Sequence, residues 1–222
     1  LRVYDADFNL PSFIPDHFVS SEVPIEFSQE EISIPETLFT IKTGVASVGA
    51  NIYLDRWSLS SIQLSLQTLA NRDLPVNAKF GNFEVKGKTS IDANLIIENG
   101  VTTLKGSVGL KNSDIIMNFN TGSKKDESED KNSEKNSYMD YVIDLDVFVD
   151  KRVHVIINPL MRALIAPSTP ISVNVDTSSG QWNINGDIVL RGGEISYLSR
   201  NFYLKEGRLI LNESQNKFDP II

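Results

Sequence analysis

QWNINGDIVLRGGEISYLSRNFYLKEGRLILNESQNKFDPII, residues 181–222, is the stretch that decides the fold. Its apolar side chains fall on one parity at Trp182, Ile184, Ile188 and Leu190. A period of two is typical of a β-strand with one buried face. The paired glycines at 192–193 interrupt this pattern and predict a turn or a bulge. We therefore expect a run of consecutive antiparallel strands that is apolar on one side.

Turn signals place further elements along the chain. Glu206-Gly207 separates two apolar runs and predicts a tight hairpin. Asn99-Gly100 is a second hairpin signal. Residues 59–69 fit both a strand and a helix face, and the strands expected on either side favour a strand. Residues 158–167 are the best helix candidate, because a proline stands near the start and leucines group on one side.

Composition excludes several classes of protein. The 222 residues include 41% hydrophobic and 23% charged residues, which are values of a globular chain. A net charge of −8 argues against binding to nucleic acid, which requires a clustered cationic surface. There is no cysteine to indicate a redox compartment, and no apolar run is long enough to span a bilayer. The chain begins within a strand pattern, so we expect it to be a piece of a longer protein.

A charged insert interrupts the strand pattern at Ser123–Ser137, SKKDESEDKNSEKNS. It has no aliphatic or aromatic side chain and so cannot bury enough apolar area to offset the entropy of ordering. We expect a disordered loop. It is either a surface insertion between two strands, which costs little stability, or a charged interaction tail.

Signals of catalysis and of metal binding are weak. His17 and His154 are far apart in the chain and offer no zinc constellation. No nucleophile elbow, phosphate-binding loop or dinucleotide fingerprint is present. The aspartates at 144, 146 and 150 alternate on one face but lack a glycine-turned calcium loop, so a solvated face is the simpler interpretation. We expect no enzymatic activity, no catalytic residues, no cofactor and no metal.

Three glycines stand where the period places an apolar side chain: Gly87, Gly106 and Gly186. A glycine there either lets the sheet bend or lets another group approach the backbone. We expect these three to form one bend line across the sheet, with three independent bulges as the alternative.

An apolar face that crosses about a dozen strands has three ways to be covered. The sheet can pack on a second sheet, close as a barrel, or curl into a trough with a partly open apolar lining. Parity is the same in all three. Short links between strands and the glycine positions favour the trough. The expected fold is all-β, a long antiparallel meander folded into a U-shaped sheet with an apolar groove and at most one or two short helices.

The final stretch resembles a known family. Residues 186–213, GDIVLRGGEISYLSRNFYLKEGRLILNE, are followed by Phe218-Asp-Pro220, and together they are similar to the C-terminal domain of the TamB family, which is related to AsmA-like proteins. The strand pair at 141–155, YVIDLDVFVDKRVHV, also resembles the family's pattern. The clear match covers Tyr141–Ile222. We treat residues 1–222 as one elongated β domain.

The resemblance implies a taco-like folded sheet in the periplasm of a diderm bacterium, within a parent chain anchored in the inner membrane through a segment absent here. It implies phospholipid acyl chains as ligands and an outer-membrane protein of the BamA or TamA type as a partner. The implied work is the transfer of phospholipid between inner and outer membrane, and with it outer-membrane biogenesis.

The resemblance and the apolar parity together predict a lipid-binding groove. Its lining is expected to comprise Val85, Leu95, Leu104, Val108, Ile143, Leu145, Val147, Val155, Val173, Trp182, Ile184, Ile188 and Leu190. The residue types alone make Trp182, Tyr197 and Phe202 packing residues more readily than ligand contacts. The alternative function is a structural or chaperone-like module that assists outer-membrane protein assembly by pairing with strand edges.

Overall fold

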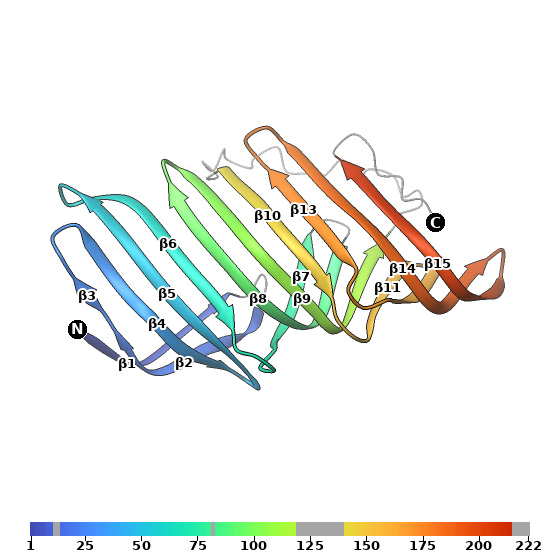
Figure 1. The fold of residues 1–222 in the computed structure, drawn as a ribbon, viewed down its shortest axis with the longest axis horizontal. Helices are drawn as coiled ribbons and strands as arrows, with labels where there is room; N and C mark the ends of the chain where they lie inside the picture. Colours follow the sequence, from blue (N-terminus) through green and yellow to red (C-terminus); the bar gives the residue numbers. More distant parts are fainter. Residues whose placement is uncertain (11–13, 81–82, 119–139, 215–222) are drawn as a thin grey trace, which may run out of the picture.

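The computed structural model describes residues 1–10, 14–80, 83–118 and 140–214 (Figure 1). The charged insert at Ser123–Ser137 and the turn signal at 81–82 lie outside the described residues. Within the described ranges all regular secondary structure is β. None of these residues forms a helix long and apolar enough to span a membrane.

One sheet contains all fifteen strands. They are β1 (Arg2–Leu10), β2 (Ile14–Pro24), β3 (Glu26–Phe27), β4 (Glu31–Ile41), β5 (Gly44–Asp55), β6 (Ser58–Thr68), β7 (Leu74–Phe80), β8 (Phe83–Glu98), β9 (Val101–Asn118), β10 (Asp140–Val149), β11 (Val153–Asn158), β12 (Met161–Ile165), β13 (Pro170–Asp176), β14 (Gln181–Tyr197) and β15 (Arg200–Ser214). The expectation of an all-β curved sheet is confirmed.

Most neighbouring strands are antiparallel, but β9 pairs in parallel with both β10 and β11. The expected purely antiparallel meander is therefore wrong at this point. Because β9 and β10 are parallel neighbours, the strands on either side of residues 119–139 run in the same direction. The sheet is mixed, and its long strands lie side by side from β4 to β15 (Figure 1).

The sheet is folded into two walls. The first wall contains β4, β5, β6, β10, β13 and the halves of β8, β9, β14 and β15 that pair with them. The second wall contains β7, β11, β12 and the other halves of the same long strands. The long strands thus run through both walls. Some shorter strands follow one another in the chain with one strand in each wall. β10 and β11 are an example: both pair with β9, and the chain between them lies where the sheet folds.

The fold line passes through links and bulges. β8 has a register shift between Lys86 and Lys88, and β9 has Asn112 at a φ of 48° beside it. The link between β10 and β11 continues the line, where the amide of Asp150 donates to the carbonyl of Leu110 at 2.8 Å. A bulge bends a strand and strengthens its twist, so a row of bulges and links folds the whole sheet.

Two apolar clusters hold the walls together. The larger cluster contains first-wall residues such as Leu110 and Ile188 together with second-wall residues such as Val155 and Ala163. The smaller cluster joins Phe18 and Ile14 of β2 to Phe39, Ala46 and other side chains. The β1–β2 hairpin crosses one end of the sheet in a second layer (Figure 1). Both clusters lie between layers of the folded sheet, so burial between layers stabilises the fold.

The expected helix at residues 158–167 is wrong. The peptide bond between Asn158 and Pro159 is cis, and β12 follows immediately. Met161, Ala163 and Ile165 alternate with more exposed side chains and are buried in the larger cluster. A short segment with this alternation gains more by completing the ladder between β11 and β14 than by forming two turns of helix.

The expected hairpin at Glu206-Gly207 is also wrong, because β15 runs unbroken through both residues. The turn lies instead at Leu198-Ser199, where φ is 48° and 61°. Gly192-Gly193 forms a bulge, one of the two predicted outcomes, and the register between β12 and β14 shifts there. The Asn99-Gly100 hairpin is confirmed, with φ of 52° and 77°.

Candidate apolar groove

An unbroken apolar row crosses eight strands of the first wall. Each residue in the row is the ladder partner of the next, from β4 to β14. The row is Ile34, Ala50, Leu64, Leu95, Leu104, Ile143, Val175 and Trp182. All but Ala50 are half-buried. Half-buried apolar side chains in a continuous row form a lining that the described part of the chain does not fully cover.

Exposure falls from this outer row toward the fold line. In the next row Leu66, Leu145, Val173 and Ile184 are half-buried and Ala93 is buried. Leu110 and Val149, paired in β9 and β10, lie nearer the fold line and are fully buried. The inner face of the first wall is therefore dry at its base and accessible toward its edge, which is the geometry of a groove.

The second wall provides the opposite lining. Its ladder partners form the row Ala78, Val85, Ile115, Val155, Ala163, Gly193 and Leu204. In this row Ala78, Ile115, Val155 and Ala163 are buried, and Val85, Gly193 and Leu204 are half-buried. The two linings share the larger apolar cluster.

The thirteen residues predicted to line a groove all lie on these inner faces. Val155, Ile188 and Leu190 are buried in the larger cluster and stabilise the fold rather than offering free surface. The other ten residues are half-buried. That second group comprises Val85, Leu95, Leu104, Val108, Ile143, Leu145, Val147, Val173, Trp182 and Ile184. Their contact with lipid remains a prediction.

The three glycines do not form one bend line. Gly87 lies at the fold line, with a φ of 146° and the register shift of β8 around it. Gly106 is inside the first wall, opposite Ala93 and Leu145, and Gly186 is inside the ladder opposite Ile171. The register puts them in three different rows. Bulges and links carry the bend instead, because they interrupt the ladder and free the backbone to turn.

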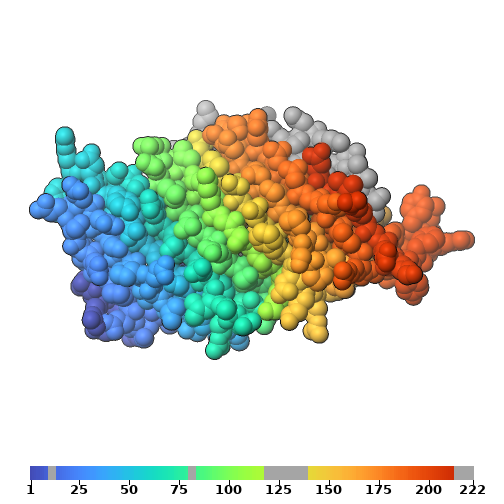
Figure 2. All heavy atoms as spheres, in the orientation of Figure 1, coloured from blue at the N-terminus to red at the C-terminus, as the bar shows by residue number. Residues whose placement is uncertain are grey.

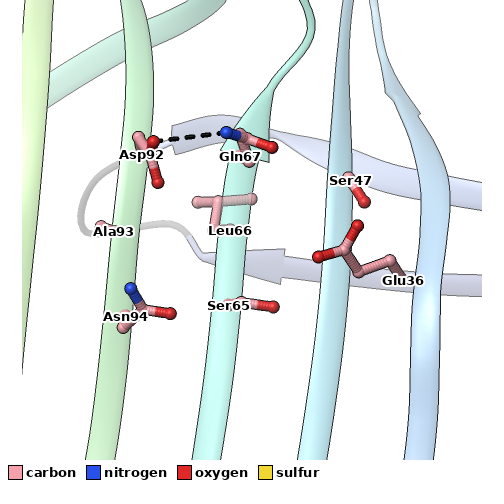
Figure 3. Close-up of a pocket in the computed structure, with 8 residues that line it drawn as sticks. All are labelled: Glu36, Ser47, Ser65, Leu66, Gln67, Asp92, Ala93 and Asn94. Atoms are coloured by element: carbon pink, nitrogen blue, oxygen red, sulfur yellow. Dashed lines mark hydrogen bonds between the residues drawn. The ribbon is translucent and has the colours of Figure 1, made fainter.

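The outer face of the first wall is polar. Gln63, Asp92, Asn94, Lys105 and Asp146 are exposed there. A shallow depression of about 160 Å³ on this face is lined by residues that include Glu36, Ser47, Ser65, Gln67 and Asp92 (Figure 3). Gln67 donates to Asp92 at 3.3 Å, which is the bond drawn in the close-up (Figure 3).

Ser65 in this lining lies close to the backbone of β5, because a Cβ at Gly49 would be 2.8 Å from its hydroxyl oxygen. The polar lining of the depression contrasts with the apolar inner face of the same strands.

Ion pairs lie at the fold line and on outer positions. Lys111 Nζ lies 2.8 Å from Asp73 Oδ2, and this hydrogen bond raises the pKa of Lys111. The pair joins the link between β6 and β7 to β9. Arg208 pairs with Asp187 across β14 and β15, and its hydrogen bond lowers the pKa of the Asp187 carboxyl.

The two histidines each have one carboxylate neighbour. His17 Nδ1 lies 2.6 Å from Asp7, and His154 Nδ1 lies 3.1 Å from Asp114. In the described ranges no group of three or more His, Asp or Glu side chains is arranged to hold a metal ion. Asp144 and Asp146 are exposed on the outer face.

Three residues of the outer row are not among the thirteen predicted lining residues. The outer row also contains Ile34, Leu64 and Val175. Leu64 was ambiguous because its segment also fits a helix face, and Ile34 lies among prolines that obscure the period. Leu64 pairs with Leu95, and Val175 pairs with Ile143 and Trp182, so the register connects these two residues directly to the predicted lining.

The family described as TamB C-terminal domain matches residues 40–222. The match therefore reaches well beyond Tyr141–Ile222, across most of the first wall. No curated protein and no solved structure matches the chain. TamB-family proteins are non-enzymatic modules of the bacterial envelope, associated with the outer-membrane assembly machinery. The chain belongs to the TamB family and has a TamB-related role in the bacterial envelope.

Proposed function

We propose that the inner face of this folded sheet shields the acyl chains of phospholipids that move between the inner and outer membranes, and so contributes to outer-membrane biogenesis. The observation that carries the proposal is the unbroken apolar row from Ile34 to Trp182, which crosses eight strands and in which every side chain except Ala50 is half-buried. A packed sandwich would bury such a row completely.

The dimensions suit an acyl chain. Neighbouring strands are ~4.8 Å apart, so eight strands give a row of roughly 34 Å. The hydrocarbon core of a bilayer is ~30 Å thick and contains two leaflets, so one acyl chain spans about 15 Å. The row is long enough for an acyl chain to lie along it and move between equivalent positions.

The chemistry also suits an acyl chain. The outer row has no charged or hydrogen-bonding side chain apart from the indole of Trp182. Such a surface attracts apolar groups without directional contacts, so it does not hold a ligand in one place. Polar headgroups would remain at the open edge, in water. We further propose a protein of the BamA or TamA type as partner and an inner-membrane anchor in the parent chain.

Two variants in β10 test the proposal. Leu145→Asp places a charge on the half-buried inner face, and Phe148→Asp makes the same kind of change at an exposed position on the outer face. The readout is phospholipid per protein after purification from bacterial membranes, measured by native mass spectrometry and solvent extraction. We expect Leu145→Asp to lose bound lipid and Phe148→Asp to retain it. Equal lipid in both variants, or no lipid in the unaltered chain, would reject the proposal.

A second candidate function has its own observation. In the described part of the chain β15 pairs with β14 alone, so the other edge of Arg200–Ser214 has no ladder partner. Such an edge can pair with an extended strand of another protein. Capture of strand peptides from outer-membrane proteins, with no phospholipid bound, would favour this function over lipid transfer.

A further inference from the structure

We propose that the tip of the β14–β15 hairpin, defined as residues 196–203, inserts into the interface of a phospholipid bilayer that contains anionic lipid. The proposal goes beyond the proposed function. It concerns a surface outside the groove and does not require lipid to move through the sheet.

The first observation is a group of exposed apolar side chains. Leu198 is 79% exposed and Tyr203 is 92% exposed, and Tyr197 and Phe202 are also exposed. Leu160 lies beside them, because its carbonyl accepts a hydrogen bond from the amide of Ser196 at 2.7 Å. The hairpin projects from the body of the molecule at the orange-red end of the chain (Figure 2). Tyrosine and leucine at a projecting tip are typical of segments that bind the membrane interface.

The second observation is that the groove lining continues onto the hairpin. Ladder partners in the second wall run from Met117 through Ile157, Met161 and Ile195 to Phe202. The first three are buried, Ile195 is half-buried and Phe202 is exposed. An apolar row that ends in water exposes surface that a bilayer interface would cover.

The third observation is the conformation of the turn. Leu198 and Ser199 both have positive φ, at 48° and 61°. The Asn99-Gly100 hairpin of the same sheet has the residues that tolerate this conformation. A leucine in the left-handed region is strained, and its exposed side chain gains no burial in return. Strain without a gain in packing indicates a residue kept for another purpose.

Charge identifies the type of membrane. The chain has a net charge of −8, whereas the tip itself, residues 196–203, contains Arg200 and no acidic side chain, and Glu194, Lys205 and Glu206 stand just beyond it. An anionic lipid surface repels the chain as a whole and attracts this tip. The tip is therefore oriented toward the bilayer while the acidic body stays in water.

A rival tip lies between β5 and β6. Trp57 is 81% exposed, and both Arg56 and Trp57 have positive φ. However, Asp55 stands next to Arg56 and balances its charge. With fewer apolar side chains and no excess of positive charge, this tip serves as the matched control.

The absence of cysteine makes single-site labelling direct. Leu198→Cys and Trp57→Cys are each labelled with a polarity-sensitive fluorophore and mixed with vesicles of phosphatidylethanolamine and phosphatidylglycerol. We expect the emission at position 198 to shift to the blue and the emission at 57 to stay unchanged. Vesicles of phosphatidylcholine alone should give a smaller shift at 198. No shift at 198, or an equal shift at both positions, overturns the proposal.

A measurement of vesicle binding that needs no label is a second test of the proposal. The double variant Leu198→Ser with Tyr203→Ser should lower the vesicle partition coefficient of the chain at least ~10-fold, which corresponds to about 1.4 kcal/mol. Both side chains are exposed, so the variant folds. An unchanged partition coefficient would contradict the proposal. Loss of vesicle binding with unchanged lipid content in the purified chain separates this surface from the groove.

Discussion

Replacing Gly106 by alanine should destabilise the sheet strongly. Gly106 pairs with Ala93 in β8 and has a φ of 152°. A Cβ there would lie 2.2 Å from the carbonyl oxygen of Asp92 and 2.5 Å from the Cα of Ala93. Both are backbone atoms of the adjacent strand. These backbone atoms can move away only if the β8–β9 ladder opens locally. No flexible side chain is in a position to move instead and make room for the added methyl group.

The magnitude follows from two costs. A non-glycine residue in this backbone region costs about 1–3 kcal/mol. Overpacking by one carbon in a well-packed site costs about 1–3 kcal/mol more. We therefore expect Gly106→Ala to lower the free energy of unfolding by about 2–6 kcal/mol. The matched control is Gly100→Ala, where φ is 77° and no atom lies within 4 Å of the added Cβ. Only the backbone cost of about 1–2 kcal/mol applies there.

Urea unfolding monitored by circular dichroism measures both variants. The midpoint should fall much further for Gly106→Ala than for Gly100→Ala, with the slope of the transition unchanged in each. If the two variants lose equal stability, Gly106 does not lie against β8 as described, and the register of the first wall is wrong.

Three further predictions concern other parts of the molecule. Phe18→Ala should cost about 3–5 kcal/mol in thermal or urea unfolding, because the ring is fully buried and stacks on Phe8 at 4.7 Å; a loss near zero would mean that the β1–β2 hairpin does not pack on the sheet. Leu198→Asn should raise the free energy of unfolding by about 1 kcal/mol, since asparagine tolerates the left-handed region, while weakening vesicle binding; a less stable variant would show that the turn is not strained. Arg208→Ala should return the lowered pKa of the Asp187 carboxyl to its ordinary range in an NMR titration. Because that pKa is lowered in the folded state, the pair stabilises the protein at neutral pH and loses this effect as pH falls through the folded pKa, so the variant should show a weaker acid dependence of stability.

Most strands, and the residues on their inner faces, could be predicted because a half-buried strand shows a period of two in its sequence. Leu104, Ile143 and Ile184 lie on the inner face as their parity indicates. The period of two does not show, however, how deeply a side chain is buried. Ile188 and Leu145 have the same pattern in sequence, yet one is buried in a dry cluster and the other is half-buried. Depth depends on distance from the fold line, which is a property of the whole sheet.

The turns were predicted less well, for local reasons. Glu206-Gly207 has turn residues, but the ladder between β14 and β15 passes through it because both flanking runs continue to find partners. Leu198-Ser199 has no turn signal and forms the hairpin. The parallel pairing of β9 with β10 could not be predicted, since the intervening residues show no strand period. In β15 the continuous pairing with β14 overrode the local turn preference of Glu206-Gly207.

The central claim is that acyl chains lie on the inner face of the folded sheet, and site-resolved crosslinking tests it most directly. The chain is loaded with phospholipid whose acyl chain carries a photoactivatable group, irradiated, digested and analysed by mass spectrometry. The account predicts adducts at half-buried inner residues such as Leu104, Leu145 and Ile184. It predicts none at Lys105 and Asp146, their outward neighbours in the same strands. Adducts spread equally over both faces, or confined to the outer face, would contradict it.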